Sequence, residues 1–216
     1  MPDALPLTIL ISGRGSNMGA IARAGIEGRI GARVTLVVSD RADAGGLGLA
    51  RDLGIDTAVL GPRGFPDRAA YGNALAELVG RKQPGLVALA GFMRILDPAF
   101  VRAFEGRLLN VHPSLLPRYP GLHTHRRVLE AGERWHGCTV HFVTEELDAG
   151  PPVVQARIRI RKDDDEDALS ARVQHWEHMI YPEAIGWFAS GRLVCRQGAA
   201  WLDGARLDQP VMRGET

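Results

Sequence analysis

The chain alternates short, uninterrupted apolar runs with longer stretches in which apolar positions recur every three or four residues. Uninterrupted runs are typical of strands buried on both faces, and the longer period is typical of amphipathic helices. In the first half, strands are expected at residues 7–12, 34–39, 57–60 and 86–90, and helices at residues 16–28, 42–53 and 67–81. Strict alternation of strand and helix predicts a doubly wound α/β fold, with a mostly parallel sheet and helices on both faces.

The second half has a different pattern. A strand is expected at Leu108–His112, followed by a proline- and glycine-rich loop and a helix at residues 126–131. Residues 139–144 and 153–160 alternate apolar and polar positions, which favours antiparallel edge strands. A long helix is expected at residues 166–189, and short strands between residues 192 and 207, with a hairpin turn at Asp203-Gly204. We expect the two halves to divide near residue 104.

Composition narrows the class of protein. The chain has 216 residues, with 26 basic and 25 acidic side chains, so charge gives no support for binding nucleic acid or a membrane surface. The N-terminus lacks the features of a secretory signal, and no apolar run approaches the roughly 20 residues of a membrane span. Two cysteines, Cys138 and Cys195, are too few for a disulfide framework. We therefore expect a cytoplasmic protein with free thiols.

A glycine-rich loop, Gly13-Arg-Gly-Ser-Asn17, follows the first predicted strand. Its glycines allow a tight turn, and the amides of residues 15–17 would lie at a helix N-terminus, where the dipole favours an anion. The loop lacks the third glycine of a dinucleotide fingerprint and the Gly-Lys-Ser/Thr of a P-loop, so it supports neither NAD nor ATP. We expect a single phosphomonoester here. The alternative is a plain turn, with Ser16 or Asn17 capping the helix.

Asn110 and His112 stand two residues apart on a predicted strand, so their side chains should project from the same face. Acyl transfer between nitrogens forms an oxyanion, which an amide N–H can stabilise while an imidazole carries protons. Asp148, from a separate loop, would favour the charged imidazolium. No serine or cysteine stands where a triad nucleophile is expected, so direct transfer is the simpler mechanism. A lone histidine or aspartate is more often structural, and these residues alone leave that reading open.

The chain resembles the phosphoribosylglycinamide formyltransferase family, folate-dependent enzymes of purine biosynthesis, over about residues 7–207. The motifs that carry this resemblance are Ile11-Ser-Gly-Arg-Gly-Ser-Asn17, Leu89-Ala-Gly-Phe-Met-Arg-Ile-Leu96, the segment 110–125, His141-Phe-Val-Thr-Glu-Glu-Leu-Asp-Ala-Gly150, Glu177-His-Met-Ile-Tyr-Pro182 and Ala199-Ala-Trp-Leu-Asp203. The resemblance implies transfer of a formyl group from 10-formyltetrahydrofolate to glycinamide ribonucleotide, giving formylglycinamide ribonucleotide and tetrahydrofolate on the route to IMP. It implies no metal and no partner beyond these small molecules, in a monomer or homodimer.

The same resemblance implies a role for each site residue. The catalytic residues would be Asn110, His112 and Asp148. The ribonucleotide would be bound by Gly15, Ser16, Asn17, Met18, Gln174 and Glu177. The folate would be bound by Arg68, Met93, Arg94, Ile95, Leu96 and Asn110. A strand at residues 94–96 would pair with the flat pterin, and Arg68 would meet the carboxylate of the glutamate tail. Residues 1–104 form a Rossmann-like half for phosphate and substrate, and residues 105–216 the catalytic and folate-binding half, within one formyltransferase domain.

Four further features of the sequence are not covered by these assigned roles. His141 either positions the loop of Asp148 or is structural, and Arg14 is expected to face solvent rather than the phosphate. Arg159-Ile-Arg161 departs from the small residues and proline expected there, and Leu116–Pro117 is a candidate cis bond.

Other functions remain possible on the sequence alone. A 10-formyltetrahydrofolate hydrolase would use the same three catalytic residues, but that family usually has an extra domain before Leu7. A methionyl-tRNA formyltransferase would have a basic domain after Leu207. A non-catalytic phosphosugar-binding protein would keep residues 15–17 without needing His112. His123 and His125 resemble a metal pair, but a zinc hydrolase needs at least a third ligand.

Overall fold

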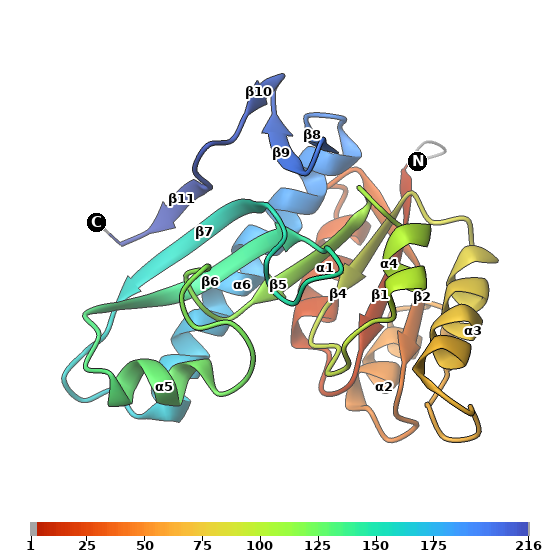
Figure 1. The fold of residues 1–216 in the computed structure, drawn as a ribbon, viewed down its shortest axis with the longest axis horizontal. Coiled ribbons are helices and arrows are strands. Elements are labelled where there is room, and N and C mark those ends of the chain that lie inside the picture. The colour runs from red at the N-terminus through yellow and green to blue at the C-terminus, as the bar shows by residue number, and fades with distance from the viewer. Residues whose placement is uncertain (1–3, 216) are drawn as a thin grey trace. The chain divides into compact units, whose positions relative to one another are not determined.

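The computed structural model describes residues 4–215, which fall into two compact units that meet in the sequence between Asn110 and Val111. The first unit alternates strands and helices throughout (Figure 1). Its strands are β1 Leu5–Ile11, β2 Ala32–Ser39, β3 Thr57–Val59, β4 Leu86–Leu89 and the start of β5 Leu108–His112. Its helices are α1 Ser16–Ile26, α2 Gly45–Asp52, α3 Arg68–Gly80 and α4 Pro98–Ala103.

The strands of the first unit pair in the order β3-β2-β1-β4-β5, and every pairing is parallel. From β1 the chain moves outward through β2 to β3, then crosses back to β4 and continues to β5. Because crossovers in parallel sheets are right-handed, this reversal sends α1 and α2 to one face and α3 and α4 to the other. The observed helix contacts agree, since α1 lies against α2 and α3 against α4. The doubly wound fold is confirmed, with its switch point between β1 and β4, where such sheets bind ligands.

Apolar side chains fill the first unit on both faces of its sheet. The fully buried ones include Leu7, Ile9, Ile11, Val37, Leu86, Val87 and Phe100. β1 and β4 have no exposed position because helices cover them on both sides, which is why their sequences show no alternation. Asp67 caps α3 as its position predicts, its side chain accepting a hydrogen bond from the Ala70 amide at 2.8 Å.

The second unit is built on an antiparallel pair of strands, β6 Trp135–Phe142 and β7 Pro152–Arg159. The long helix α6, Glu166–Ala189, packs against both strands and buries Tyr181 and Ile185. A short helix, α5 Thr124–Glu130, precedes β6. The expected antiparallel strands of the C-terminal half are therefore confirmed, and α6 has the predicted bounds.

Four short strands complete the second unit. β8 Leu193–Arg196, β9 Ala199–Leu202 and β10 Ala205–Arg206 form an antiparallel meander, and β11 Val211–Gly214 pairs with β7 in parallel. The turn between β9 and β10 lies at Asp203-Gly204, as predicted, with φ values of 52° and 80°. Two successive residues with positive φ match the twist of a hairpin.

The structure corrects several predicted elements. α4 and β11 were not expected, and β6 begins at Trp135 rather than at residue 139. Residues 94–96 lie in the loop between β4 and α4 and form no strand. Within the part of the chain that the structure describes, that loop is joined to the end of β1 by backbone hydrogen bonds at Ala90 and Gly91 only, and residues 94–96 take part in no strand pairing. Among the described helices, none has the length and apolar character needed to cross a bilayer.

Candidate active site

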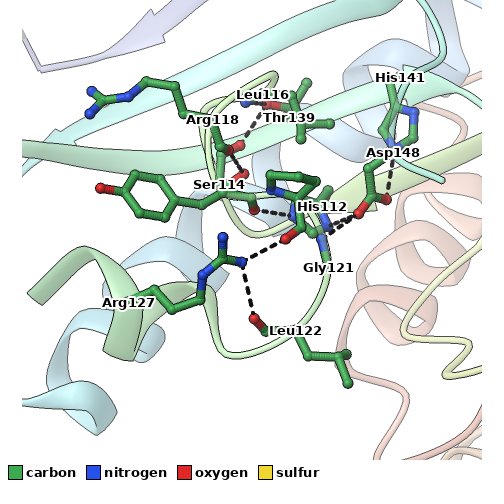
Figure 2. A network of polar contacts seen from close by, with 12 residues as sticks. His112, Ser114, Leu116, Arg118, Gly121, Leu122, Arg127, Thr139, His141 and Asp148 are labelled. Carbon is green, nitrogen blue, oxygen red and sulfur yellow. Dashed lines mark hydrogen bonds and ion pairs between the residues drawn. The ribbon is translucent and has the colours of Figure 1, made fainter. Parts of the chain in front are cut away.

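His112 and Asp148 lie together in the second unit, in the network that Figure 2 shows. His112 ends β5, and Asp148 lies in the loop between β6 and β7. Nδ1 of His112 lies 3.4 Å from Oδ2 of Asp148, and the two side chains are only 8% and 7% exposed. A carboxylate this deeply buried requires a positive or hydrogen-bonding partner, because desolvation of an isolated charge is costly. The predicted pairing of these two residues is thus present.

Two backbone groups of the loop between β5 and α5, residues 113–123, complete the surroundings of this pair. Nε2 of His112 lies 3.0 Å from the carbonyl oxygen of Tyr119, and the amide of Gly121 donates to Oδ2 of Asp148 at 2.8 Å. A carbonyl can only accept, so Nε2 carries a proton in this contact. Both ring nitrogens face acceptors, and the imidazolium, with two N–H groups, satisfies both. Sequence reasoning missed Tyr119 and Gly121, because backbone groups leave no trace in residue type.

His141 lies on the other side of Asp148, with its Nε2 3.9 Å from Oδ1. That distance is too long for a hydrogen bond. Its Nδ1 instead donates to the carbonyl oxygen of Phe142 at 2.9 Å, which leaves Nε2 as the unprotonated nitrogen of the neutral ring. Burial lowers the pKa of His141 to about 4, although the Phe142 carbonyl and Asp148 oppose that shift. His141 is therefore neutral near pH 7, and His112 is the histidine placed to share charge with Asp148.

A buried scaffold holds the turn that follows His112. The hydroxyl of Thr139 donates to the Ser114 carbonyl at 2.6 Å and accepts from the Leu116 amide at 3.1 Å. The side-chain amide of Gln155 donates to the Leu116 carbonyl at 2.7 Å. These contacts join the turn to β6 and β7, so the strand pair fixes the position of His112. The Leu116–Pro117 bond is cis, as the sequence analysis proposed.

The glycine-rich loop of the first unit leads from β1 into α1 at the carboxyl end of the sheet. Gly15 is the N-cap residue, with φ of 75°, and no side chain caps the helix. A Cβ on Gly15 would lie 2.7 Å from Cα of Gly46, and the Gly46 amide donates to the Gly13 carbonyl at 3.0 Å. The alternative of a turn capped by Ser16 or Asn17 is therefore wrong. The first turn of an α-helix has backbone amides without intrahelical partners, and no side chain caps those of α1, an arrangement that suits an anion.

The loop after β4 carries four of the predicted folate residues; three of them are exposed and Leu96 is half-buried. Met93 and Ile95 are 68% and 59% exposed, which is unusual for large apolar side chains. The amide of Met93 donates to Oγ of Ser12 at 2.9 Å, so the loop is joined to the end of β1. Nε of Arg94 lies 2.6 Å from Oδ2 of the buried Asp40, which follows β2. The loop is thus held at the switch point with the side chains of Met93 and Ile95 uncovered.

The other four predicted site residues lie on three elements: Arg68 on α3, Asn110 on β5, and Gln174 and Glu177 on α6. Arg68 begins α3, where its Nε lies 3.8 Å from Oδ2 of Asp97 and more than half of its side chain is exposed. Asn110 is half-buried on β5, in register with Leu89 of β4. Gln174 and Glu177 lie on successive turns of α6, with Glu177 buried and Gln174 half-buried.

The histidines considered as a metal pair have other surroundings. Nδ1 of His125 lies 2.9 Å from Nε2 of His136, and His123 is the exposed N-cap residue of α5. Burial, together with the charges of His125 and His112, lowers the pKa of His136 to about 3. Two imidazoles this close share one proton rather than carrying two. Within residues 4–215, no group of three or more His, Cys, Asp or Glu side chains is arranged so that it could hold a metal ion.

The first unit is a doubly wound α/β sheet with an uncapped helix at its switch point, and the second unit buries a histidine–carboxylate pair. Both features are typical of α/β enzymes. The profile of the formyl transferase family matches residues 6–185. The chain belongs to this family. It is 53% identical over 201 residues to the phosphoribosylglycinamide formyltransferase of Escherichia coli strain K12, covering 93% of this chain and 95% of that protein.

Other relatives agree in name and in fold. The phosphoribosylglycinamide formyltransferase of Haemophilus influenzae is 42% identical over 201 residues, covering 93% of this chain and 95% of that protein. The crystal structure of the Coxiella burnetii phosphoribosylglycinamide formyltransferase, in complex with CHES, superposes with a TM-score of 0.92 at 44% identity. That superposition covers 97% of this chain and 99% of the other. The family resemblance read from the motifs is confirmed.

Proposed function

We propose that this enzyme transfers the formyl group of 10-formyltetrahydrofolate to the amine of glycinamide ribonucleotide, producing formylglycinamide ribonucleotide and tetrahydrofolate in purine biosynthesis. The names of its relatives and the extent of the match support this reaction. The single structural observation that carries the chemistry is the buried His112–Asp148 pair, whose two ring nitrogens both face acceptors. Both substrates are small molecules, and we expect the reaction in the cytoplasm.

Direct transfer requires the protein to stabilise an oxyanion and to move a proton. The amine nitrogen attacks the formyl carbon, and the carbonyl oxygen becomes an oxyanion that requires hydrogen-bond donors. The side-chain amide of Asn110 and the imidazolium of His112 would supply them. The bond from the formyl carbon to N10 then breaks, so the amine loses one proton and N10 requires one. His112, as the imidazolium, would give N10 a proton from Nε2 once Nε2 leaves the Tyr119 carbonyl, and it would then take up the proton lost by the amine, while Asp148 holds the ring through Nδ1. No covalent enzyme intermediate is required.

The binding roles follow from the chemistry of each segment. The first turn of α1, with Gly15, Ser16, Asn17 and Met18, would bind the phosphate of the ribonucleotide through backbone amides. Gln174 and Glu177 would contact its sugar and its glycinamide group. The exposed apolar residues of the loop after β4 would pack against the pterin, and the guanidinium of Arg68 would meet the glutamate carboxylate. Residues 1–104 would thus supply the phosphate loop, and residues 105–216 all three catalytic side chains.

The test is a coupled assay with 10-formyltetrahydrofolate, run with and without glycinamide ribonucleotide. We expect tetrahydrofolate to form only when the ribonucleotide is present, with formylglycinamide ribonucleotide produced in equal amount. Tetrahydrofolate and formate appearing at the same rate without the ribonucleotide would show a hydrolase instead. Binding of both substrates with no turnover would show a non-catalytic binding protein. An assay in excess chelator separates this chemistry from a metal-dependent one, and we expect no loss of rate.

A further inference from the structure

The His112–Asp148 pair is held by the backbone of the β5–α5 loop (residues 113–123) rather than by side chains alone. The Tyr119 carbonyl accepts from Nε2 of His112, and the Gly121 amide donates to Oδ2 of Asp148. That same Oδ2 is the oxygen nearest to Nδ1 of His112. A shift of this loop would therefore move the partners of both members of the pair at once.

The loop adopts a backbone conformation that it does not favour by itself. Tyr119, Gly121 and His123 all have positive φ, of 57°, 77° and 57°. For residues with a side chain, the left-handed region is sterically unfavourable, and it persists only where the surroundings enforce it. The conformation that presents the Tyr119 carbonyl and the Gly121 amide must therefore be imposed from outside the loop.

Arg127 is the side chain placed to impose it. Its Nη1 donates to the Pro120 carbonyl at 2.6 Å and to the Leu122 carbonyl at 3.4 Å, so it joins the two residues that flank Gly121. Its guanidinium also lies 5.3 Å from the centre of the Tyr119 ring, within the range of a cation–π contact. Figure 2 shows Arg127 reaching from α5 to this part of the loop. One side chain thus contacts three of the four residues from 119 to 122.

The neighbouring residue of the same helix provides an internal comparison. Arg126 is exposed, and its Nε lies 3.1 Å from the Glu166 carboxylate at the start of α6. Arg127 instead is half-buried and points to the loop. Two adjacent arginines on one helix therefore have the same charge and helix propensity but different targets. This separates the effect of loop contact from the effect of charge on α5.

We propose that Arg127 is a positioning residue: by holding the carbonyls of Pro120 and Leu122 and the ring of Tyr119, it sets the loop geometry that orients His112 and Asp148. Arg127 need not touch either substrate. This role rests on the proposed function for its effect on rate, but its effect on the ring of His112 is independent of the reaction. Loss of Arg127 should therefore lower kcat and leave both KM values nearly unchanged.

The experiment compares R127Q with R126Q and R127K. We expect R127Q to lose about tenfold in kcat, because small misplacements of catalytic groups have large effects on rate, with KM for each substrate changed less than about twofold. R126Q should match the wild type. R127K, which keeps a cation and a donor on a shorter reach, should recover part of the lost rate. A kcat for R127Q equal to that of R126Q, or a loss confined to KM, would overturn the proposal.

A second measurement is needed, since a variant that only loosens the fold also loses rate. Two-bond ¹H–¹⁵N correlations of the histidine rings report which nitrogens of His112 carry protons. R127Q should change that pattern for His112, whereas R126Q should leave it as in the wild type. An unchanged ring pattern in R127Q would contradict the proposal even if the rate fell. If the wild type itself transferred no formyl group, the proposed function would fail, and this comparison would still decide the role of Arg127.

Discussion

The loop between β1 and α1 and the His112–Asp148 pair are built in opposite ways. The loop is one contiguous segment, and its expected ligand contacts are backbone amides freed by Gly15 at the start of an uncapped helix. The pair comes from two segments separated by 36 positions in the numbering, and each member depends on backbone groups from a third. A local site tolerates changes elsewhere in the chain. An assembled site depends on every segment that contributes to it.

The two sites also differ in how they treat charge. The first turn of α1 offers partial positive charge from the helix dipole, and it carries no ionisable side chain. The second unit buries the side chains of Asp148 and Glu177 and those of three histidines, His112, His136 and His141. Burial keeps His136 and His141 neutral near pH 7, and His112 is the histidine that faces the Asp148 carboxylate. We therefore expect a fall in pH to perturb the region of the His112–Asp148 pair before it affects the loop between β1 and α1.

The largest effect is expected from substitutions within the pair. H112A and D148N should each reduce kcat by about 10²–10⁴, the range that general acid–base groups supply. Both substrates should still bind, because neither side chain forms the phosphate loop. D148N keeps an oxygen that can accept from Gly121, so its loop should stay in place.

The matched control for this prediction is H175A, which removes an exposed histidine from α6. It should retain the wild-type kcat, measured in the same coupled assay. A kcat within twofold of the wild type in either H112A or D148N would remove the proposed mechanism.

The next effect is expected in the local site. In G15A, the new methyl group would lie 2.7 Å from the Gly46 backbone, at a residue with φ of 75°. We expect the free energy of unfolding to fall by about 1–3 kcal/mol and KM for the ribonucleotide to rise at least about tenfold. KM for the folate should stay nearly constant.

The control for G15A is G48A, on α2, where no atom lies within 4 Å of the added methyl group. It should gain up to about 1 kcal/mol in urea unfolding, because alanine is the better helix former. If G15A bound the ribonucleotide as the wild type does, residues 15–18 would not be the phosphate site.

The pH dependence of stability should be dominated by the second unit. The pKa values of His136 and His141 fall from the ordinary 6.5 to about 3 and about 4 on folding, chiefly through burial. Below pH 6.5 these two histidines are protonated in the unfolded chain but stay neutral in the folded protein. The free energy of unfolding therefore falls as the pH falls. Each group contributes roughly 1.4 kcal/mol per pH unit until its folded pKa is reached.

Urea unfolding of the wild type between pH 7.5 and 5 measures this slope, and H136Q should flatten it. H175Q, which changes an exposed histidine, should keep the wild-type slope. An identical slope in H136Q and the wild type would show that the buried pair of His125 and His136 does not control acid sensitivity.

The smallest effect is expected from a helix cap. Asp67 caps α3 through the Ala70 amide, whereas the start of α1 has no side-chain cap. D67A should lower the free energy of unfolding by about 1 kcal/mol and leave KM for the ribonucleotide unchanged. A change in that KM would mean that the start of α1 is not independent of its neighbours.

The elements that could be predicted from the sequence are likewise those whose structure is determined locally. α6 was predicted with its exact bounds because 24 residues establish a period and acidic residues mark its first turn. α4, with six residues, is too short to establish one, and β11 takes its register from β7 rather than from its own pattern. The position of the loop after β4 depends on Ser12 and Asp40, which lie far from it in the sequence.

The site residues show the same limit. Gly15 could be recognised because its role is local, and His112 and Asp148 because the family motifs name them. The sequence could not identify the carbonyl of Tyr119, the amide of Gly121 or the side chain of Arg127. Their roles appear only when the β5–α5 loop is folded. Residue type predicts chemistry, but long-range packing decides which backbone atoms take part in it.

The most direct test of this account is a single-turnover experiment with 10-formyltetrahydrofolate carrying a ¹³C formyl group. Mass spectrometry would follow the label in the ribonucleotide, in formate and on the enzyme. We expect the label to pass to the amine of glycinamide ribonucleotide with no labelled enzyme, and D148N to lose that transfer while still binding both substrates. Label in formate regardless of the ribonucleotide, or a labelled side chain on the enzyme, would contradict direct transfer by the His112–Asp148 pair.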